Sequence, residues 1–214
     1  MKTKIQKWLL LFLLMMAGLN GVWGQDTTIA DIDFSNPISG GVAAGRVNTM
    51  TIGSHANNPT TISDGRLVLG KTENTVVIPE QQRDGNLVRL TFDFAFGKLV
   101  NRYVNFYLKD AVGNDIAYFT YQPYYNSLNT NLGISTSDLP ANDNEANWAK
   151  SVSFTITLNY SSNQITTRTS VSNIDRTVWM SNTNAFAAFV VSSNYDNFDR
   201  YCQFDNLFRC CYRW

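Results

Sequence analysis

The 214-residue sequence is poor in the residues that most often carry out chemistry. It has one histidine, His55, which excludes a histidine-rich metal site and makes any Ser-His-Asp or Cys-His catalytic centre depend on that residue alone. Charged residues are only 16% of the chain, and 17 basic residues balance 17 acidic ones. Because no excess of positive charge would attract phosphates, we do not expect nucleic acid as a partner.

Cysteine is also scarce, and all three cysteines lie near the end of the chain: Cys202, Cys210 and Cys211. An odd number cannot form a closed set of intramolecular disulfides, and adjacent cysteines pair only with strain. The hydrophobic core must therefore hold the fold. The last residues, 208–214, resemble neither a linker nor an anchoring signal, which suggests that a longer parent polypeptide was cut short or shifted in reading frame. The alternative is a natural terminus.

The first 24 residues have the pattern of a secretory signal peptide. Three lysines precede an apolar run over 8–16, and Val22-Trp23-Gly24 provides a cleavage site of small-residue type. A membrane span needs roughly 20 apolar residues, so a retained anchor is the less favoured alternative. Cleavage after Gly24 removes the three lysines, which leaves 14 basic against 17 acidic residues and a net charge of −3. We expect a secreted protein, extracellular, at the cell surface or periplasmic, with a single domain over 25–214 and no transmembrane anchor after cleavage.

Alternation with a period of two recurs along the chain, whereas no stretch after the signal peptide keeps apolar residues at a period of 3.6. The clearest cases are 88–96, 104–109 and 152–160. Further strand candidates are 29–34, 47–52, 66–69, 75–78, 165–171, 185–191 and 201–208. About ten strands, each with one apolar face, predict an all-β fold in which two antiparallel sheets pack as a β-sandwich.

Several motifs occur in a particular order along the chain. They are Asp31-Ile32-Asp33-Phe34, the segment 64–69, the Phe-rich strand 88–96, the hairpin 106–115, Trp148 before the strand 152–158, and Phe204-Asp205-Asn206-Leu207. This order resembles the concanavalin A-like, laminin-G-like jelly rolls of secreted bacterial polysaccharide-handling or cell-surface proteins. The resemblance implies that the first and last strands pair, with 204–208 against 29–34. It also implies binding or cleavage of glycans.

The motifs of the enzymes that share this fold are missing. Retaining glycosidases of the jelly-roll type carry Glu-x-Asp-x-x-Glu, because a nucleophile and an acid must lie about 5 Å apart. None of the glutamates, Glu73, Glu80 and Glu145, lies in such a motif. The Arg-x-Glu-x-Arg and Gln-Ile-His segments of alginate-lyase-like jelly rolls are absent as well. We therefore expect no catalytic residues.

The prediction is a secreted, non-catalytic, lectin-like module that binds a polysaccharide or another glycan, either alone or as the N-terminal module of a larger polysaccharide-degrading or adhesive protein. In the second case a C-terminal catalytic or adhesive domain is missing from this sequence. Two alternatives stay open. One is a glycoside hydrolase or polysaccharide lyase with a site of another kind, and the other is a structural or adhesive surface module without glycan binding.

Strand register predicts where the exposed side chains meet. Pairing Lys109 with Ile116 across the loop 110–115 keeps apolar residues opposite one another, and folding the strand 88–96 onto this hairpin extends its outer face. Aromatic rings can stack on sugar rings while polar groups bond the hydroxyls. The predicted sugar-binding patch is Arg89, Asp93, Asn105, Tyr107, Tyr118 and Thr120. The alternative is an ordinary sheet face, since Tyr and Thr are favoured in strands.

Three more aromatic residues are candidates for ligand contact. Tyr124 and Tyr125 form either a binding lip or a packed corner, and Trp179 is either an exposed stacking residue or a plug at one end of the sandwich. A structural calcium ion is compatible with an extracellular protein rich in oxygen ligands. The candidate ligands are Asp31 and Asp33 near Asp205, or Asp196 and Asp199, although acidic residues in turns are commonly only turn formers.

Overall fold

The computed structural model describes most of the chain after the predicted signal peptide. The described residues are 27–32, 34, 42–56, 58–63, 65–83, 85–95, 103–141, 150–194 and 203–213. The predicted signal peptide (1–24), Asp33, Trp148, Cys202 and the segment with Asp196 and Asp199 lie outside these ranges, so the predictions made for them are not tested. Within the described ranges, no helix is long and apolar enough to cross a bilayer.

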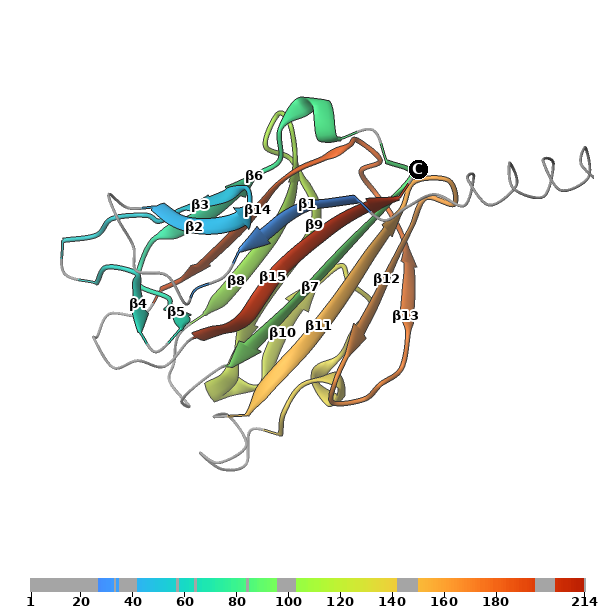
Figure 1. The fold of residues 1–214 in the computed structure, drawn as a ribbon. Coiled ribbons are helices and arrows are strands. Elements are labelled where there is room, and N and C mark those ends of the chain that lie inside the picture. The colour runs from blue at the N-terminus through green and yellow to red at the C-terminus, as the bar shows by residue number, and fades with distance from the viewer. Residues whose placement is uncertain are drawn as a thin grey trace, which may run out of the picture.

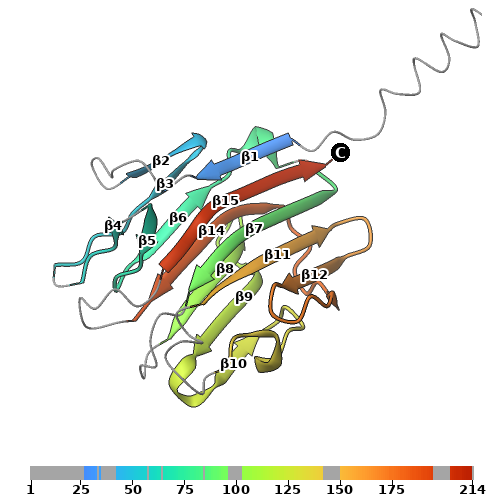
Figure 2. The same cartoon turned by 60° about the horizontal axis from the view of Figure 1, so that its bottom comes forward.

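The described strands form two antiparallel layers, which Figures 1 and 2 show from two directions. One layer, called sheet A here, has the spatial order β1 (Thr27–Ile32), β15 (Gln203–Arg213), β7 (Leu87–Ala95), β11 (Ser151–Asn159), β12 (Gln164–Thr169) and β13 (Arg176–Trp179). The other, sheet B, has the order β10 (Ser127–Thr130), β9 (Asp115–Gln122), β8 (Val104–Asp110), β14 (Phe186–Ser193), β6 (Glu73–Val77) and β3 (Thr49–Thr51). The predicted all-β sandwich is confirmed.

Three short strands complete the arrangement. β2 (Val42–Val47) pairs with β1 on one side and with β3 on the other, so it links the two sheets. β4 (Thr61–Ser63) and β5 (Arg66–Val68) form a hairpin that joins sheet A through β15. Four strands were not predicted. β2 has the sequence VAAGRV, which shows no alternation of apolar and polar residues. β4, β10 and β13 have only three or four residues with little apolar content, which give almost no alternation signal.

A cluster of phenylalanine rings holds the two sheets together. Phe92 and Phe154 come from sheet A, and Phe106, Phe119 and Phe189 from sheet B. Ring centroids lie 5.3 Å apart for Phe92 and Phe106 and 5.7 Å apart for Phe119 and Phe154, both in edge-to-face geometry. Since the rings at the centre of each strand point inward, the residues on either side of them must point outward to solvent.

The predicted pairing of the first and last strands is correct, but its register differs. β1 pairs with the end of β15, from Ile32 opposite Phe208 to Thr27 opposite Tyr212. Residues 208–213 therefore belong to a strand in the middle of sheet A, between β1 and β7. Cys210 is fully buried there, and burial raises the pKa of its thiol well above the ordinary value.

The register predicted for the hairpin β8–β9 is correct over five pairs, from Val104 opposite Tyr121 to Leu108 opposite Ala117. Near the turn, Lys109 lies opposite Asp115 rather than Ile116, because a bulge shifts the register there. The prediction that strand 88–96 folds beside this hairpin is wrong. β7 pairs with β11 and β15 in sheet A, and its Phe92 packs edge to face against Phe106 of β8 in the opposite sheet.

An ion pair between a buried carboxylate and a half-buried arginine fixes the start of β13. Asp138 lies in η3 (Thr136–Asp138), is fully buried, and accepts two hydrogen bonds from Arg176, from Nη2 to Oδ1 at 3.0 Å and from Nε to Oδ2 at 3.3 Å. The Ser135 backbone N–H donates to the same carboxylate at 2.9 Å. Burial alone would favour the neutral acid, but the hydrogen bonds of Arg176 and Ser135 outweigh it and lower the pKa of Asp138 to about 2.

We expect Phe154→Ala to lower the free energy of unfolding by about 3 to 5 kcal/mol, because it leaves a cavity at the contact between the sheets. Val112→Ala is the matched control, since Val112 is 79% exposed in a turn and should change stability little. Urea unfolding of both variants gives the comparison. Equal stabilities would show that the phenylalanine cluster does not hold the sheets together.

We also expect Asp138→Asn to reduce the loss of stability in acid. The pKa of Asp138 is 3.8 ordinarily and about 2 in the folded protein, so its charge stabilises the fold above about pH 4 and this contribution disappears as the pH falls toward 2. The variant should be less stable at neutral pH and should show a shallower decline between these limits. Urea unfolding across this range measures it, with Asp175→Asn as the control. Parallel curves for wild type and Asp138→Asn would contradict the assignment.

Candidate functional site

The outer face of sheet A carries a floor of short polar side chains. Thr155 and Thr157 project outward from β11, between inward-facing Phe154, Ile156 and Leu158. β11 pairs with β7 on one side and with β12 on the other. Since threonine is short, longer side chains on the two flanking strands rise above it on both sides.

Two arginines stand on either side of this threonine floor. Arg89 of β7 lies opposite Thr157, and Arg168 of β12 lies opposite Thr155, so β11 separates the two strands. Together they enclose a hollow of about 430 Å³, called the sheet A hollow here. It is lined by Arg89, Thr91, Thr155, Thr157, Thr166, Arg168 and Asp175.

Asp175 closes the far side of the sheet A hollow. It precedes β13, and its Oδ1 lies 3.7 Å from Nη1 of Arg168, with both side chains at least half exposed. The next residue, Arg176, points inward to Asp138, so the alternation of the chain directs Asp175 and Thr177 outward. Thr177 in turn shares a hydrogen bond with Thr166 at 3.1 Å. The ion pair between Arg176 and Asp138 thus positions the outer rim of the hollow.

Trp179 extends the same face beyond the hollow. It lies opposite Gln164 on the edge strand β13, two residues after Thr177, so it is about 7 Å further along the strand. Its side chain is 73% exposed. Of the two readings of Trp179 from the sequence, the structure shows the exposed residue and not the plug. An exposed indole can stack on one sugar ring of a glycan chain, while the polar side chains of the hollow bond the hydroxyls of neighbouring rings.

The predicted six-residue patch is divided between the two faces of the sandwich. Arg89 and Asp93 lie on the outer face of sheet A, because β7 belongs to that sheet. Asn105, Thr120, Tyr107 and Tyr118 lie on sheet B, in the predicted pairs. The prediction failed because the sequence does not distinguish two arrangements. A Phe-rich strand can bury its apolar face either as a neighbour of the hairpin in the same sheet or as part of the opposite sheet.

On sheet B the two tyrosines are half-buried rather than projecting. The ammonium group of Lys109 lies 5.0 Å from the ring centre of Tyr107 and also forms an ion pair of 2.7 Å with Asp115. One face of the Tyr107 ring is therefore occupied within the protein itself. This makes the sheet B tyrosines a poorer stacking surface than Trp179.

Tyr124 and Tyr125 lie in η2 (Pro123–Tyr125), at the end of β9 away from the Asp110 turn. They are 51% and 60% exposed, and their rings meet edge to face with centroids 4.9 Å apart. This geometry agrees with an exposed lip rather than a packed corner. The lip belongs to the edge of sheet B and is separate from the sheet A hollow.

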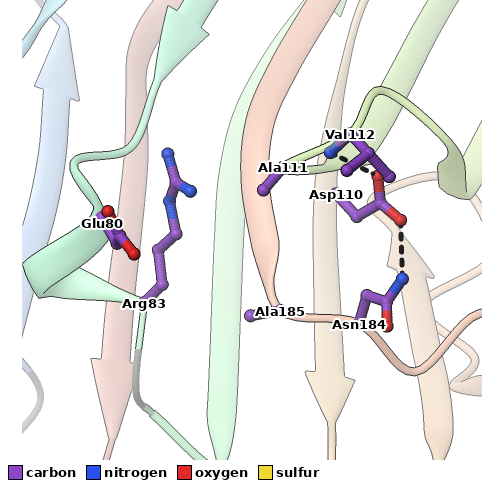
Figure 3. A pocket seen from close by; sticks show the side chains of 7 residues that line it. All are labelled: Glu80, Arg83, Asp110, Ala111, Val112, Asn184 and Ala185. Carbon is purple, nitrogen blue, oxygen red and sulfur yellow. Dashed lines mark hydrogen bonds between the residues drawn. The ribbon is translucent and has the colours of Figure 1, made fainter.

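A second hollow, of about 380 Å³, lies at the end of the sandwich (Figure 3). In Figure 3, Arg83 and Glu80 stand on one side of it and Asp110 with Asn184 on the other. Asp110 is buried and accepts hydrogen bonds from the side chains of Asn184 (2.8 Å) and Asn182 (3.1 Å). Backbone N–H groups of Val112 and Asn114 donate to it as well.

The hydrogen bond from Asn184, with those from Asn182 and the turn, holds the pKa of Asp110 well below its usual range, against the opposing effect of burial. Because both carboxylate oxygens already accept N–H groups, Asp110 ties the β8–β9 turn to the loop before β14. We therefore assign this carboxylate to the structure of the turn rather than to a ligand.

The structure does not test the calcium prediction, because Asp33, Asp196 and Asp199 lie outside the described ranges and the side chain of Asp205 is not described. Asp31 lies opposite Arg209 in the ladder, whereas Asp205 lies opposite Asp93, four residues away along β15. Among the described residues, no group of three or more His, Cys, Asp or Glu side chains is placed to hold a metal ion. Asp33 is outside the described ranges, so its part in such a site is not tested.

Sequence reasoning missed most of the hollow. Thr91, Thr155, Thr157, Thr166, Arg168 and Asp175 were not predicted as site residues. Their alternation was visible, but threonine in a strand normally indicates only strand propensity. One sequence signal could have identified them. Arg89 and Arg168 lie at outward-facing positions of two strands, and the strand between them has only short threonines at its outward-facing positions.

Comparison with solved structures gives the fold. The CBM2 module of the evolved Dit of Lactobacillus casei BL23 phage J-1 is 11% identical, with a TM-score of 0.57, and the match covers 90% of this chain and 98% of that one. The carbohydrate recognition domain of Emp47p is 8% identical, with a TM-score of 0.50, over 88% of this chain and 96% of that one. The fold is a concanavalin A-like β-sandwich.

Larger proteins contain the same sandwich. The binding domain of botulinum neurotoxin DC, in complex with SialylT, is 11% identical with a TM-score of 0.51, over 86% of this chain. A sialidase is 13% identical with a TM-score of 0.51, over 87% of this chain. The chain spans 47% of the neurotoxin chain and 18% of the sialidase chain. No protein-family model matches the sequence, and no curated protein matches it either.

We expect Asp110→Ala to lower the melting temperature, because the turn and the amides of Asn182 and Asn184 lose their common acceptor. Glu80→Ala, on the opposite wall of the same hollow, removes an exposed carboxylate and serves as the control. Thermal unfolding followed by circular dichroism measures both. If Asp110→Ala melted with the wild type, Asp110 would not be the structural tie described here.

Proposed function

We propose that this chain is a secreted, non-catalytic carbohydrate-binding module that holds a glycan on the outer face of sheet A. The observation that carries the proposal is the exposed indole of Trp179 next to the sheet A hollow. An exposed indole leaves apolar surface in contact with water, which is unfavourable. A sugar ring stacked on Trp179 would cover this surface, and the hydroxyls of neighbouring rings in the same glycan would meet the threonine and arginine side chains of the hollow. The structural neighbours named as carbohydrate-binding or carbohydrate-recognition domains support this reading.

A binding role fits the hollow better than a catalytic one. Glycoside hydrolysis usually needs two carboxyl groups flanking the sugar bond. Asp175 is the one carboxylate among the residues that line the sheet A hollow, and it is paired with Arg168. The hollow is also open to solvent, which suits contact with one side of an extended chain rather than an enclosed reaction.

The proposed function includes a location outside the cytoplasm. The predicted signal peptide, 1–24, would carry the module out of the cytoplasm, where polysaccharides and cell-surface glycans occur. The module would then act alone or attach a larger polysaccharide-degrading or adhesive protein to its glycan. Detection of the mature chain in the culture medium or on the cell surface tests the location, and retention in the cytoplasm would contradict it.

We expect Trp179→Ala to weaken glycan binding by about tenfold or more, since a stacked tryptophan is commonly the residue that dominates an interface. The test is a glycan array with residues 25–214, followed by calorimetric titration of the glycans that bind. The melting curve should stay close to wild type, because the indole is exposed.

Tyr107→Ala and Tyr118→Ala are the matched controls, because these aromatic residues lie on the opposite sheet. They should leave the affinity unchanged. If the tyrosine variants lost binding and Trp179→Ala did not, the glycan site would lie on sheet B. If the array showed no binding at all, the carbohydrate-binding function itself would be rejected.

A further inference from the structure

The charges around the sheet A hollow are unequal. Arg89 and Arg168 line it with two guanidinium groups, and Asp175 is the single opposing carboxylate. Arg168 and Asp175 form an exposed pair at 3.7 Å, which is a weak interaction in water. Among the described residues, none is found in an ion pair with Arg89. The rim of the hollow therefore has a local excess of positive charge, in a chain that has none overall.

Arginine at both sides of the floor indicates what kind of group the hollow receives. The planar guanidinium group presents paired N–H donors that match a carboxylate or a sulfate with two parallel hydrogen bonds. Neutral sugar hydroxyls do not need this geometry. From the two arginines and the threonine floor we infer that the ligand is an acidic polysaccharide, whose uronate carboxylates or sulfate groups are bound by Arg89 and Arg168. This inference rests on the proposed glycan-binding function.

The spacing of the arginines favours a polymer over a small anion. Arg89 and Arg168 are two strands apart, about 10 Å across the sheet, and are offset by one pair of residues, about 7 Å along it. Their Cα atoms are thus roughly 12 Å apart, with Thr155 and Thr157 between them. A chain that carries acidic groups at intervals can reach both arginines while its sugar hydroxyls contact the threonines. Trp179 then lies beside the hollow, where a further ring of the same chain could stack.

Asp175 also has a role in this scheme. Its carboxylate already occupies Arg168 in part, so an acidic ligand must compete with it. Asp175 therefore lowers the affinity of the hollow for an acidic ligand, and Arg89 is the stronger of the two anion contacts. Removal of the Asp175 charge should therefore strengthen the binding of an acidic chain, and it should not affect a neutral one.

The test compares polymers that differ in charge alone. Polygalacturonate is titrated against its highly methyl-esterified form, and a sulfated galactan against neutral agarose, with single-stranded DNA as a polyanion of another class. We expect binding of at least one acidic glycan, weaker binding with added salt, and much weaker binding of the uncharged partner. Arg89→Gln should reduce the affinity about tenfold or more, whereas Asp175→Asn should increase it severalfold.

Two control variants separate a charge contact from a loss of folding. Arg83→Gln removes an arginine from the other hollow and should leave the affinity unchanged. Arg89→Lys keeps the charge but loses the two-pronged donor, so it should bind more weakly than wild type and more strongly than Arg89→Gln. Melting curves close to wild type for Arg89→Gln and Arg89→Lys confirm that the exposed side chain is not needed for folding.

The failures of the two proposals can be told apart. Binding that depends on Trp179 but is equal for neutral and acidic glycans, and unaffected by Arg89→Gln, would overturn the acidic ligand and keep the carbohydrate-binding module. Equal binding of single-stranded DNA and acidic glycans would overturn the specificity for a polysaccharide. No binding to any of the glycans would remove the proposed function and this inference together.

Discussion

The packing of phenylalanine rings between the sheets is the constraint on which the rest of the molecule depends. Phe92 and Phe154 of sheet A meet Phe106, Phe119 and Phe189 of sheet B at centroid distances near those of favourable aromatic pairs. Because side chains alternate between the two faces of a strand, the residues next to these phenylalanines in the sequence must face outward. In β11, the residues that face inward form part of the core, and the residues that alternate with them, Thr155 and Thr157, form the floor of the hollow.

A second constraint comes from the buried carboxylate of Asp138. Its contact with Arg176 turns one residue of β13 inward and so turns Asp175 and Thr177 outward, next to Arg168 and Thr166. A charge in the interior thereby determines the position of a charge on the surface. The edge strand β13 is short and pairs with one strand, β12. The contact between Arg176 and Asp138 is a second interaction that holds β13 in register.

The sequence allowed the sandwich and one hairpin to be predicted, because alternation and a turn fix the register of neighbouring strands. Tyr107 and Tyr118 do face each other, as expected. Alternation does not say whether two strands lie side by side or face to face, so Arg89 was placed with the wrong partners. The hollow was missed for the same reason, since Thr155 and Thr157 become a floor only when the flanking strands are known to carry Arg89 and Arg168.

The position of β15 has a consequence for how the chain folds. Thr27 pairs with Tyr212, so sheet A joins residues from the two ends of the described sequence, and β15 separates β1 from β7. Such distant pairings make folding slow, because the entropy of closing a long loop is lost before the contacts form. Until β15 arrives, β1 and β7 each expose an unpaired edge to other chains. A chain in which β15 has not yet paired is therefore prone to aggregation through these two edges.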